Sequence, residues 1–138
     1  MLKSEVLKGK RIVIAEDEGV IQIQLRKGLG LAGLIVVGQA MTGEAALEIV
    51  LEEKPDLVLM DLSLPGMDGI EITRRVLAEN SRLLVVMMPG NSDALHRQQA
   101  LDAGACGYLL KPITMSELIA ELEHCWKQHD PKQNSAPS

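Results

Sequence analysis

An apolar run that ends in a carboxylate constrains the fold of this chain more than any other feature. Residues 57–60 (LVLM) lead directly into Asp61, and residues 62–69 (LSLPGMDG) then break the chain with proline and glycine. An uninterrupted apolar run bounded in this way is typical of a strand buried on both faces of a parallel sheet. The carboxyl end of such a strand is where α/β proteins bind ligands. Asp61 therefore lies at a position suited to chemistry, although an aspartate that only caps the next turn fits the same pattern.

Similar apolar runs recur along the chain and alternate with helical patterns. Five strands alternating with five helices predict a parallel sheet covered on both faces, in a single doubly wound (βα)5 α/β domain. We assign this domain to residues 10–128, after a lead-in at 1–9 and before a polar segment at 129–138, which we expect to be disordered or to begin a linker. The predicted strands are residues 12–15, 34–40, 57–60, 83–88 and 107–110, and the predicted helices are 19–31, 42–53, 68–80, 93–103 and one beginning at 114.

The predicted helix at residues 19–31 has the weakest local signal. Its first half alternates apolar and polar residues as a strand does, whereas Ile21, Leu25 and Leu29 have helical spacing. A parallel sheet needs a crossover here, so we predict a helix. Residues 28–33 (GLGLAG) match the pattern of dinucleotide-binding loops, but they would close a helix rather than follow a strand, which argues against nucleotide binding.

Three helix starts carry capping signals. Thr42 is a predicted N-cap, and residues 68–71 (DGIE) and 114–117 (TMSE) resemble capping boxes. In a capping box the first side chain accepts a hydrogen bond from the backbone of the fourth residue, whose carboxylate accepts one in return. We therefore expect helices to begin directly after Thr42, Asp68 and Thr114.

The composition argues against several classes of function. The chain has no phenylalanine, one tryptophan and one tyrosine, which leaves almost no platform for stacking single-stranded nucleic acid. Its net charge of -5 argues against direct nucleic-acid binding, which needs a basic surface. No apolar run approaches the roughly 20 residues of a membrane span, and the first residues do not resemble a signal peptide, so we expect a cytoplasmic location. Cys106 and Cys125 have no metal-binding spacing with the histidines, and we expect two separate core thiols.

Charged residues follow the carboxyl ends of the predicted strands. Glu16 and Asp17, with Glu18 behind them, follow the first strand; Asp61 follows the third, and Lys111 follows the fifth. Because these ends meet at one edge of a parallel sheet, we expect the side chains to lie together. Clustered carboxylates suit a hard cation such as Mg²⁺, and a lysine beside them can balance phosphoryl oxygens. The combination favours phosphoryl transfer onto a carboxylate, although Lys111 could serve only to neutralise the acidic cluster.

Taken in this order, the residues resemble the receiver domains of two-component response regulators, which have the CheY-like fold. The resemblance covers about residues 10–127, and the motifs that carry it are Glu16 and Asp17, Asp61, residues 65–69 (PGMDG) and residues 104–112 (GACGYLLKP). It implies a flavodoxin-like sheet with strand order 2-1-3-4-5 and a cis peptide bond before Pro112. It also implies that Asp61 accepts a phosphoryl group from a histidine kinase or a phosphotransfer protein.

The resemblance also implies the ligands of a magnesium ion. Asp17, Asp61 and the backbone carbonyl of Ser63 would hold Mg²⁺, and Glu16 would act mostly through water. Ser63 and Asn91 lie two positions beyond the phosphoacceptor and beyond the end of the fourth strand. Their side chains would tune the lifetime of the phosphorylated state by admitting or excluding water.

The chain departs from the family at the end of the fourth strand. The family normally has threonine or serine there, whose hydroxyl turns toward the phosphoryl group, but this chain has Pro89, which lacks both a hydroxyl and an N–H. The N–H of Gly90 could still reach a phosphoryl oxygen. Tyr108 occupies the family's aromatic switch position, which moves inward with that hydroxyl. We therefore predict that Pro89 weakens or reroutes the coupling between Asp61 and Tyr108.

Three functions fit these residues. The first is a phosphoacceptor receiver that switches partner binding, with no enzyme activity beyond its own phosphorylation and slow self-dephosphorylation. The second is a phosphorylation-independent interaction module, which Pro89 favours and the intact acids disfavour. The third is a phosphatase with Asp61 as nucleophile, but a second acid to protonate the leaving group is missing two positions later. The kinase and the output domain or downstream partner stay unknown, and the surface made by the fourth helix, fifth strand and last helix could support a homodimer.

Overall fold

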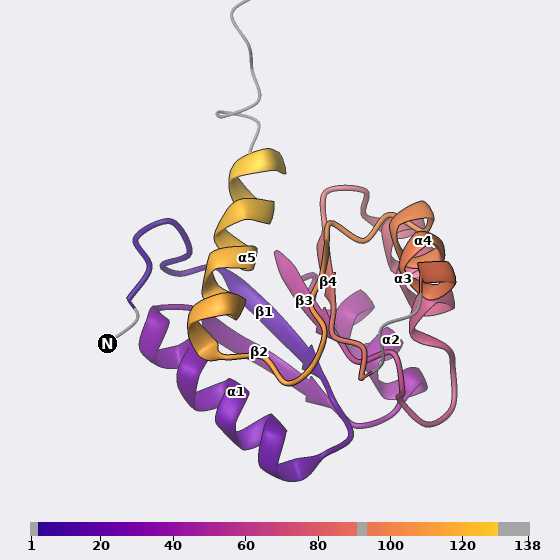
Figure 1. Cartoon of the computed structure of the whole chain (residues 1–138), viewed down its shortest axis with the longest axis horizontal. Helices are drawn as coiled ribbons and strands as arrows, with labels where there is room; N and C mark the ends of the chain where they lie inside the picture. The colour runs from indigo at the N-terminus through magenta and orange to yellow at the C-terminus, as the bar shows by residue number, and fades with distance from the viewer. Residues whose placement is uncertain (1–2, 91–93, 130–138) are drawn as a thin grey trace, which may run out of the picture.

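The computed structural model describes residues 3–90 and 94–129, which form a five-stranded parallel sheet between two layers of helices (Figure 1). The strands lie in the order β2-β1-β3-β4-β5, and every neighbouring pair is parallel. The predicted doubly wound fold and its strand order are therefore confirmed. In chain order the elements are β1 (Arg11–Ala15), α1 (Gly19–Ala32), β2 (Ile35–Ala40), α2 (Gly43–Glu53), β3 (Leu57–Met60), α3 (Gly69–Glu79), β4 (Leu84–Met87), α4 (Ala94–Asp102), β5 (Gly107–Tyr108) and α5 (Met115–His129).

Different helices cover the two faces of the sheet (Figure 1). One core lies beneath α1 and α5, where Leu29 and Leu122 are buried against the strands. The other core lies beneath α2, α3 and α4, to which these helices contribute Val50, Val76 and Ala100. Among the described residues, no helix has both the length and the apolar character needed to cross a membrane.

The central strand, β3, explains the uninterrupted apolar run of the sequence. All four of its residues are buried. Leu57 and Leu59 belong to the core beneath α1 and α5, whereas Val58 and Met60 belong to the core on the opposite face. Successive side chains of a strand point to opposite faces, so a strand covered on both faces has no position for a polar residue. Asp61 is the first residue after β3 and lies at the carboxyl edge of the sheet.

Two of the three predicted helix caps form as expected. The hydroxyl oxygen of Thr42 accepts a hydrogen bond of 3.2 Å from the N–H of Ala45. At the start of α5, the hydroxyl oxygen of Thr114 accepts from the N–H of Glu117 at 3.1 Å, and the Glu117 carboxylate accepts from the N–H of Thr114 at 3.1 Å. These bonds lower the pKa of Glu117 and confirm the capping box there.

The start of α3 differs from the predicted capping box. The Asp68 carboxylate caps the helix, but it accepts from the N–H of Ile70 at 2.9 Å rather than from the fourth residue. The carboxylate of Glu71 does not turn back toward Asp68. It instead accepts hydrogen bonds from Arg74 and Arg75 one turn later, at 3.4 and 3.3 Å. The reciprocal bond was therefore predicted wrongly, because cations at helical spacing compete for the same carboxylate.

The ambiguous segment after β1 is a helix, as predicted. Gly28 and Gly30 lie inside α1, and Gly33 ends it with φ of 112°, in the left-handed region where glycine is favoured. The N–H of Gly33 bonds to the carbonyl of Gly30 at 3.1 Å. The glycine pattern thus closes a helix, which confirms the argument against a dinucleotide loop.

β5 is shorter than the predicted strand at 107–110. Only Gly107 and Tyr108 pair with β4 in regular register. The N–H of Lys111 still bonds to the carbonyl of Pro89 at 2.9 Å, but Leu110 is 46% exposed. An edge strand has a neighbour on one side only, so fewer pairings hold the chain in register. The peptide bond between Lys111 and Pro112 is cis, as the resemblance implies.

Both ends of the described chain extend the packed domain beyond the predicted boundaries. α5 includes His129, which the sequence places in the tail, and the Nδ1 atom of His129 lies 3.0 Å from the carbonyl oxygen of Cys125. The rest of the predicted tail, 130–138, lies outside the described residues. In the predicted lead-in, Leu7 is fully buried, and the Ser4 hydroxyl donates to the Glu123 carboxylate at 2.7 Å.

The two cysteines lie closer together than predicted. Cys125 is buried on α5, and Cys106 packs against the same core. A hydrogen bond with Cys106, together with burial, raises the pKa of Cys125. Both thiols are free, but the expectation that they are separate is wrong, because Cys106 packs against the core to which Cys125 belongs.

Candidate functional site

Asp61 lies at the carboxyl edge of the sheet with only 2% of its surface exposed. Its N–H extends the sheet by bonding to the carbonyl of Ala15 at 2.9 Å. One carboxylate oxygen accepts from the N–H of Ser63 at 3.0 Å, and the other lies 3.3 Å from the ammonium of Lys111. Asp61 therefore does cap the turn that follows it, but it also lies beside a cation from a strand that is distant in sequence.

Glu16 is the most buried charged group of the site, with no exposed surface. Its carboxylate lies 2.5 Å from the Lys111 ammonium and also accepts from the N–H of Glu18 at 3.0 Å. Burial raises the pKa of Glu16, and the neighbouring charge of Asp61 acts in the same direction, against the lowering effect of these hydrogen bonds. Lys111 and the N–H of Glu18 therefore both favour the anionic form of a carboxylate that burial disfavours.

Lys111 links the two strand ends electrostatically. Burial by itself lowers the pKa of Lys111, but the hydrogen bond to Glu16 and the negative charge of Asp61 outweigh burial, so its pKa is raised. The lysine is therefore a cation at neutral pH, with 19% of its side chain exposed. A partly exposed ammonium beside Asp61 is placed to balance an incoming anion.

The predicted cation ligands fall into two groups. Oxygen atoms of the Glu16, Asp17 and Glu18 carboxylates all lie within 4.8 Å of one another. Asp61 is not in this group, and its carboxylate is engaged by Lys111 and by the N–H of Ser63. Carboxylate oxygens at this separation fit the hard-cation chemistry of Mg²⁺. The structure therefore brings a suitable donor set together on the loop after β1 and places Asp61 across Lys111 from it.

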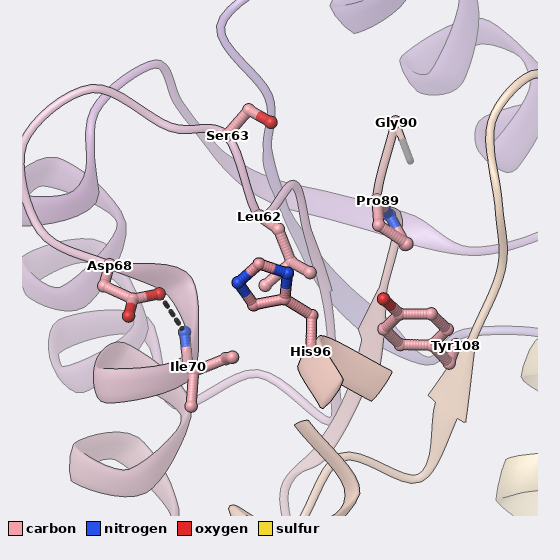
Figure 2. Close-up of a pocket in the computed structure, with 8 residues that line it drawn as sticks. All are labelled: Leu62, Ser63, Asp68, Ile70, Pro89, Gly90, His96 and Tyr108. Carbon is pink, nitrogen blue, oxygen red and sulfur yellow. Dashed lines mark hydrogen bonds between the residues drawn. The ribbon is translucent and has the colours of Figure 1, made fainter. Parts of the chain in front are cut away.

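The opposite side of the edge is formed by the end of β4, β5 and the start of α4. Pro89 is buried, whereas Gly90 is exposed and has open space where a Cβ would lie. Pro89, Gly90, His96 and Tyr108 all border a cavity of about 150 Å³ (Figure 2). Figure 2 shows the Tyr108 ring on the same side of this cavity as Pro89, and the hydroxyl oxygen of Tyr108 is buried.

Of the two residues expected to tune the lifetime of a phosphorylated state, the structure describes only Ser63. Ser63 is exposed at the rim of the same cavity, opposite Pro89 in Figure 2. Asn91 lies outside the described residues. His96 of α4 also borders this cavity and extends into the space between Asp68 and Tyr108 (Figure 2).

A family model supplies the identification. The model of the response regulator receiver domain matches residues 12–123 of the chain. The chain belongs to the response regulator receiver family. The match includes Glu16, Asp17, Asp61 and Lys111, and such receiver domains of two-component systems are not conventional enzymes.

Curated relatives agree with this assignment. The receiver is 38% identical over 114 residues to the transcriptional regulatory protein PdtaR of Mycobacterium tuberculosis (strain ATCC 25618 / H37Rv). That alignment covers 83% of this chain and 55% of PdtaR. It is 37% identical to the uncharacterized transcriptional regulatory protein YhcZ of Bacillus subtilis (strain 168). That alignment covers 89% of this chain and 66% of YhcZ. The chain thus spans about half the length of PdtaR and about two thirds of YhcZ.

Solved structures agree with the fold. The signal receiver domain of NarL from Mycobacterium tuberculosis superposes with a TM-score of 0.82 at 31% identity and covers 87% of this chain and 98% of that one. A CheY-like receiver domain protein from Methanospirillum hungatei JF-1 superposes with a TM-score of 0.84 at 25% identity and covers 91% of this chain and 99% of that one. Both are similar to this receiver over nearly their full length.

Proposed function

We propose that this receiver is a phosphoacceptor in a two-component phosphorelay and that Asp61 is the residue phosphorylated. The observation that carries the proposal is the contact of one lysine with two buried carboxylates: Lys111 lies 2.5 Å from Glu16 and 3.3 Å from Asp61. A buried lysine that only neutralised charge would satisfy this geometry too. The partial exposure of Lys111, and its place at the carboxyl edge of a receiver fold, favour the functional role.

The reaction is the transfer of a phosphoryl group from a phosphohistidine donor. A carboxylate oxygen of Asp61 attacks phosphorus, the new O–P bond forms, and the P–N bond to the donor imidazole breaks with its electron pair returning to nitrogen. Lys111 balances negative charge on the phosphoryl oxygens throughout. The product is an acyl phosphate, and attack of water on phosphorus slowly restores Asp61.

The carboxylates of Glu16 and Asp17, together with Asp61 and the backbone carbonyl of Ser63, would hold Mg²⁺. When bound, the ion supplies positive charge that screens the incoming phosphoryl group from these acids. Glu16 also keeps Lys111 in place, since its carboxylate is the nearer of the two partners of the ammonium. The N–H of Ser63 orients the Asp61 carboxylate from the other side.

The partners of this receiver are also proposals. We expect a histidine kinase or a phosphotransfer protein as the donor. Because the chain spans only about half the length of PdtaR, we expect an output domain or a separate downstream protein to receive the signal. A homodimer through α4, β5 and α5 would use a surface that includes the exposed side chains of Leu101 and Leu110.

The proposal is tested by incubation with Mg²⁺ and acetyl phosphate, followed by intact mass spectrometry. We expect one labile phosphoryl adduct that is absent from Asp61→Asn and present in the control Asp56→Asn, a strand-flanking aspartate at the opposite edge of the sheet. An adduct that persists in Asp61→Asn would place the acceptor elsewhere.

A second function, a phosphorylation-independent interaction module, is favoured by one observation. Pro89 is buried where the family has a hydroxyl, so this receiver lacks the side chain that normally responds to the phosphoryl group. The two functions separate in the same assay: no adduct with acetyl phosphate and none with a competent histidine kinase would favour the interaction module.

A further inference from the structure

A buried amide lies directly behind the acidic loop. Gln22 is on the second turn of α1, and only 5% of its surface is exposed. Its Nε2 atom lies 3.2, 3.0 and 2.9 Å from the carbonyl oxygens of Ile14, Glu16 and Ala40. Its Oε1 atom accepts a hydrogen bond of 2.7 Å from the side chain of Gln39. One side chain therefore interacts with β1, with the loop after β1 and with the end of β2.

These acceptors lie at the end of the sheet, and one of them, the Glu16 carbonyl, lies beyond the last residue of β1. The last backbone bond between the two chain segments runs from the N–H of Glu16 to the carbonyl of Ala40 at 3.0 Å. Beyond it the loop after β1 turns away toward α1, and its carbonyls have no strand beside them. Unpaired carbonyl groups inside a protein are costly, and the Gln22 amide supplies hydrogens to them.

The fixed backbone of Glu16 determines where its carboxylate points. That carboxylate reaches Lys111, and Lys111 in turn reaches Asp61. Asp17 and Glu18 follow on the same loop, and their carboxylates complete the acidic cluster. A continuous series of contacts thus runs from the Gln22 amide to the oxygen atoms that would hold a cation.

We propose that Gln22 is a positioning residue for Mg²⁺ binding, acting through the backbone of the loop that carries Glu16 and Asp17. The inference rests on the proposed function, because it assigns a role in the same cation site. Gln22 itself touches neither the acids' carboxylates nor Asp61 through any contact described in residues 3–90 and 94–129. Residues that hold metal ligands in place commonly change metal affinity by about 10- to 100-fold when they are replaced.

Glutamine is the side chain that this position requires. It presents two N–H hydrogens to the carbonyls and one oxygen to Gln39, so each of its polar atoms has a partner. Leucine has a similar size but would remove the hydrogen bonds to all three carbonyls, and the Ala40 carbonyl would keep only its bond from the N–H of Glu16. Glutamate would place a negative carboxylate against carbonyl oxygens. The pattern explains why a polar residue occupies an inward position between Ile21 and Ile23.

The test is a calorimetric Mg²⁺ titration of the 138-residue chain and of Gln22→Leu. We expect Gln22→Leu to bind Mg²⁺ about tenfold more weakly than the parent. The matched control is Ser4→Ala, which also removes buried hydrogen bonds but at the other end of the molecule, where Ser4 contacts Glu123 and the N–H of Leu7. The control should lose stability and keep its Mg²⁺ affinity. Equal weakening in both variants, or in neither, would overturn the inference.

Two further measurements keep the inference separate from the proposed function. Asp17→Asn should abolish binding in the same titration. If the parent itself binds no more Mg²⁺ than Asp17→Asn, the proposed function fails and the inference fails with it. If the parent binds and Gln22→Leu binds equally, only the inference fails. If Gln22→Leu does not fold, Gln39→Leu decides, because the Gln39 side chain is exposed and donates to the Gln22 oxygen: about threefold weaker binding supports the inference, and unchanged binding overturns it.

Discussion

The carboxyl edge of the sheet has two regions that differ in how completely they match the receiver family. The first, which we call the acceptor region after its proposed role, is made of Glu16, Asp17, Asp61 and Lys111, and Lys111 contacts the buried carboxylates of Glu16 and Asp61. In the response region, made of Pro89, His96 and Tyr108, the hydroxyl that would sense a phosphoryl group is replaced by a proline ring (Figure 2). Under the proposed function, accepting a phosphoryl group would use the first set of residues and transmitting its arrival would use the second, so one could change while the other is kept.

The largest expected effect tests the acceptor region. Lys111→Met should slow formation of the phosphoryl adduct by about 100-fold, because a charge that stabilises the transferring group in a partly buried site is lost. The rate of adduct formation with acetyl phosphate, followed by intact mass, measures the effect. The exposed Lys127→Met serves as the control and should react like the parent. A rate within threefold of the parent for Lys111→Met would show that the region is structural only.

The response region is tested by restoring the missing hydroxyl. In Pro89→Thr, phosphorylation should change the NMR spectrum of residues 95–127 at least about twofold more than it does in the parent, because the two states then differ in their contacts with the phosphoryl group. The adduct should form at a similar rate in both proteins. Equally large spectral responses in the two proteins would remove the distinction between the regions.

The pH dependence of stability sharpens the account of the acceptor region. Burial raises the pKa of Glu16 above its usual value of 4.5. At a pH between 4.5 and the raised pKa, the Glu16 carboxyl keeps its proton in the folded chain but has released it in the unfolded chain. The stability contributed by Glu16 is therefore fully present below pH 4.5 and is lost as the pH rises through the raised value.

Urea unfolding of the parent and of Glu16→Gln checks this direction. The unfolding free energy of the parent, minus that of the variant, should fall as the pH rises above 4.5 in the absence of Mg²⁺. Glu52→Gln, an exposed site on α2, is the control and should show no such trend. A difference that grows with pH would contradict the sign of the shift.

The smallest expected effect concerns Tyr108. Tyr108→Phe removes a buried hydroxyl and should change the unfolding free energy by no more than about 1 kcal/mol. Its rate of adduct formation should stay within about twofold of the parent, because the hydroxyl lies outside the acceptor region. A much slower reaction would show that the two regions are coupled despite Pro89.

The acceptor region could be predicted from the sequence because a strand buried on both faces leaves a continuous apolar run in the sequence. A strand covered on both faces must be apolar throughout, so Leu57 to Met60 mark β3 and Asp61 marks its end. The same reasoning locates Glu16 after β1. Once the strands are parallel, their carboxyl ends must share one edge, and Lys111 joins the acids without any local signal that links them.

Other parts of the site could not be predicted because their signals are not local. Gln22 lies in an alternating pattern that resembles an exposed polar position, and only the ends of β1 and β2 make it a buried one. Leu7 belongs to a short segment without periodicity, and its burial depends on α1 and α5 packing over it. His96 of α4 lines the same cavity as Asp68, which caps α3, and neither residue carries a local signal for the other (Figure 2).

The sequence by itself determined the alternation of strands and helices, the sheet edge where the charges gather, and the absence of a hydroxyl at Pro89. These features follow from periodicity and from residue identity, which need no knowledge of the rest of the chain. The tertiary structure decided that one lysine contacts both Glu16 and Asp61, that a buried amide holds the acidic loop, and that Tyr108 lies beside Pro89. Such contacts join residues from elements that are distant in sequence, and their distances depend on how closely the helices and the sheet pack.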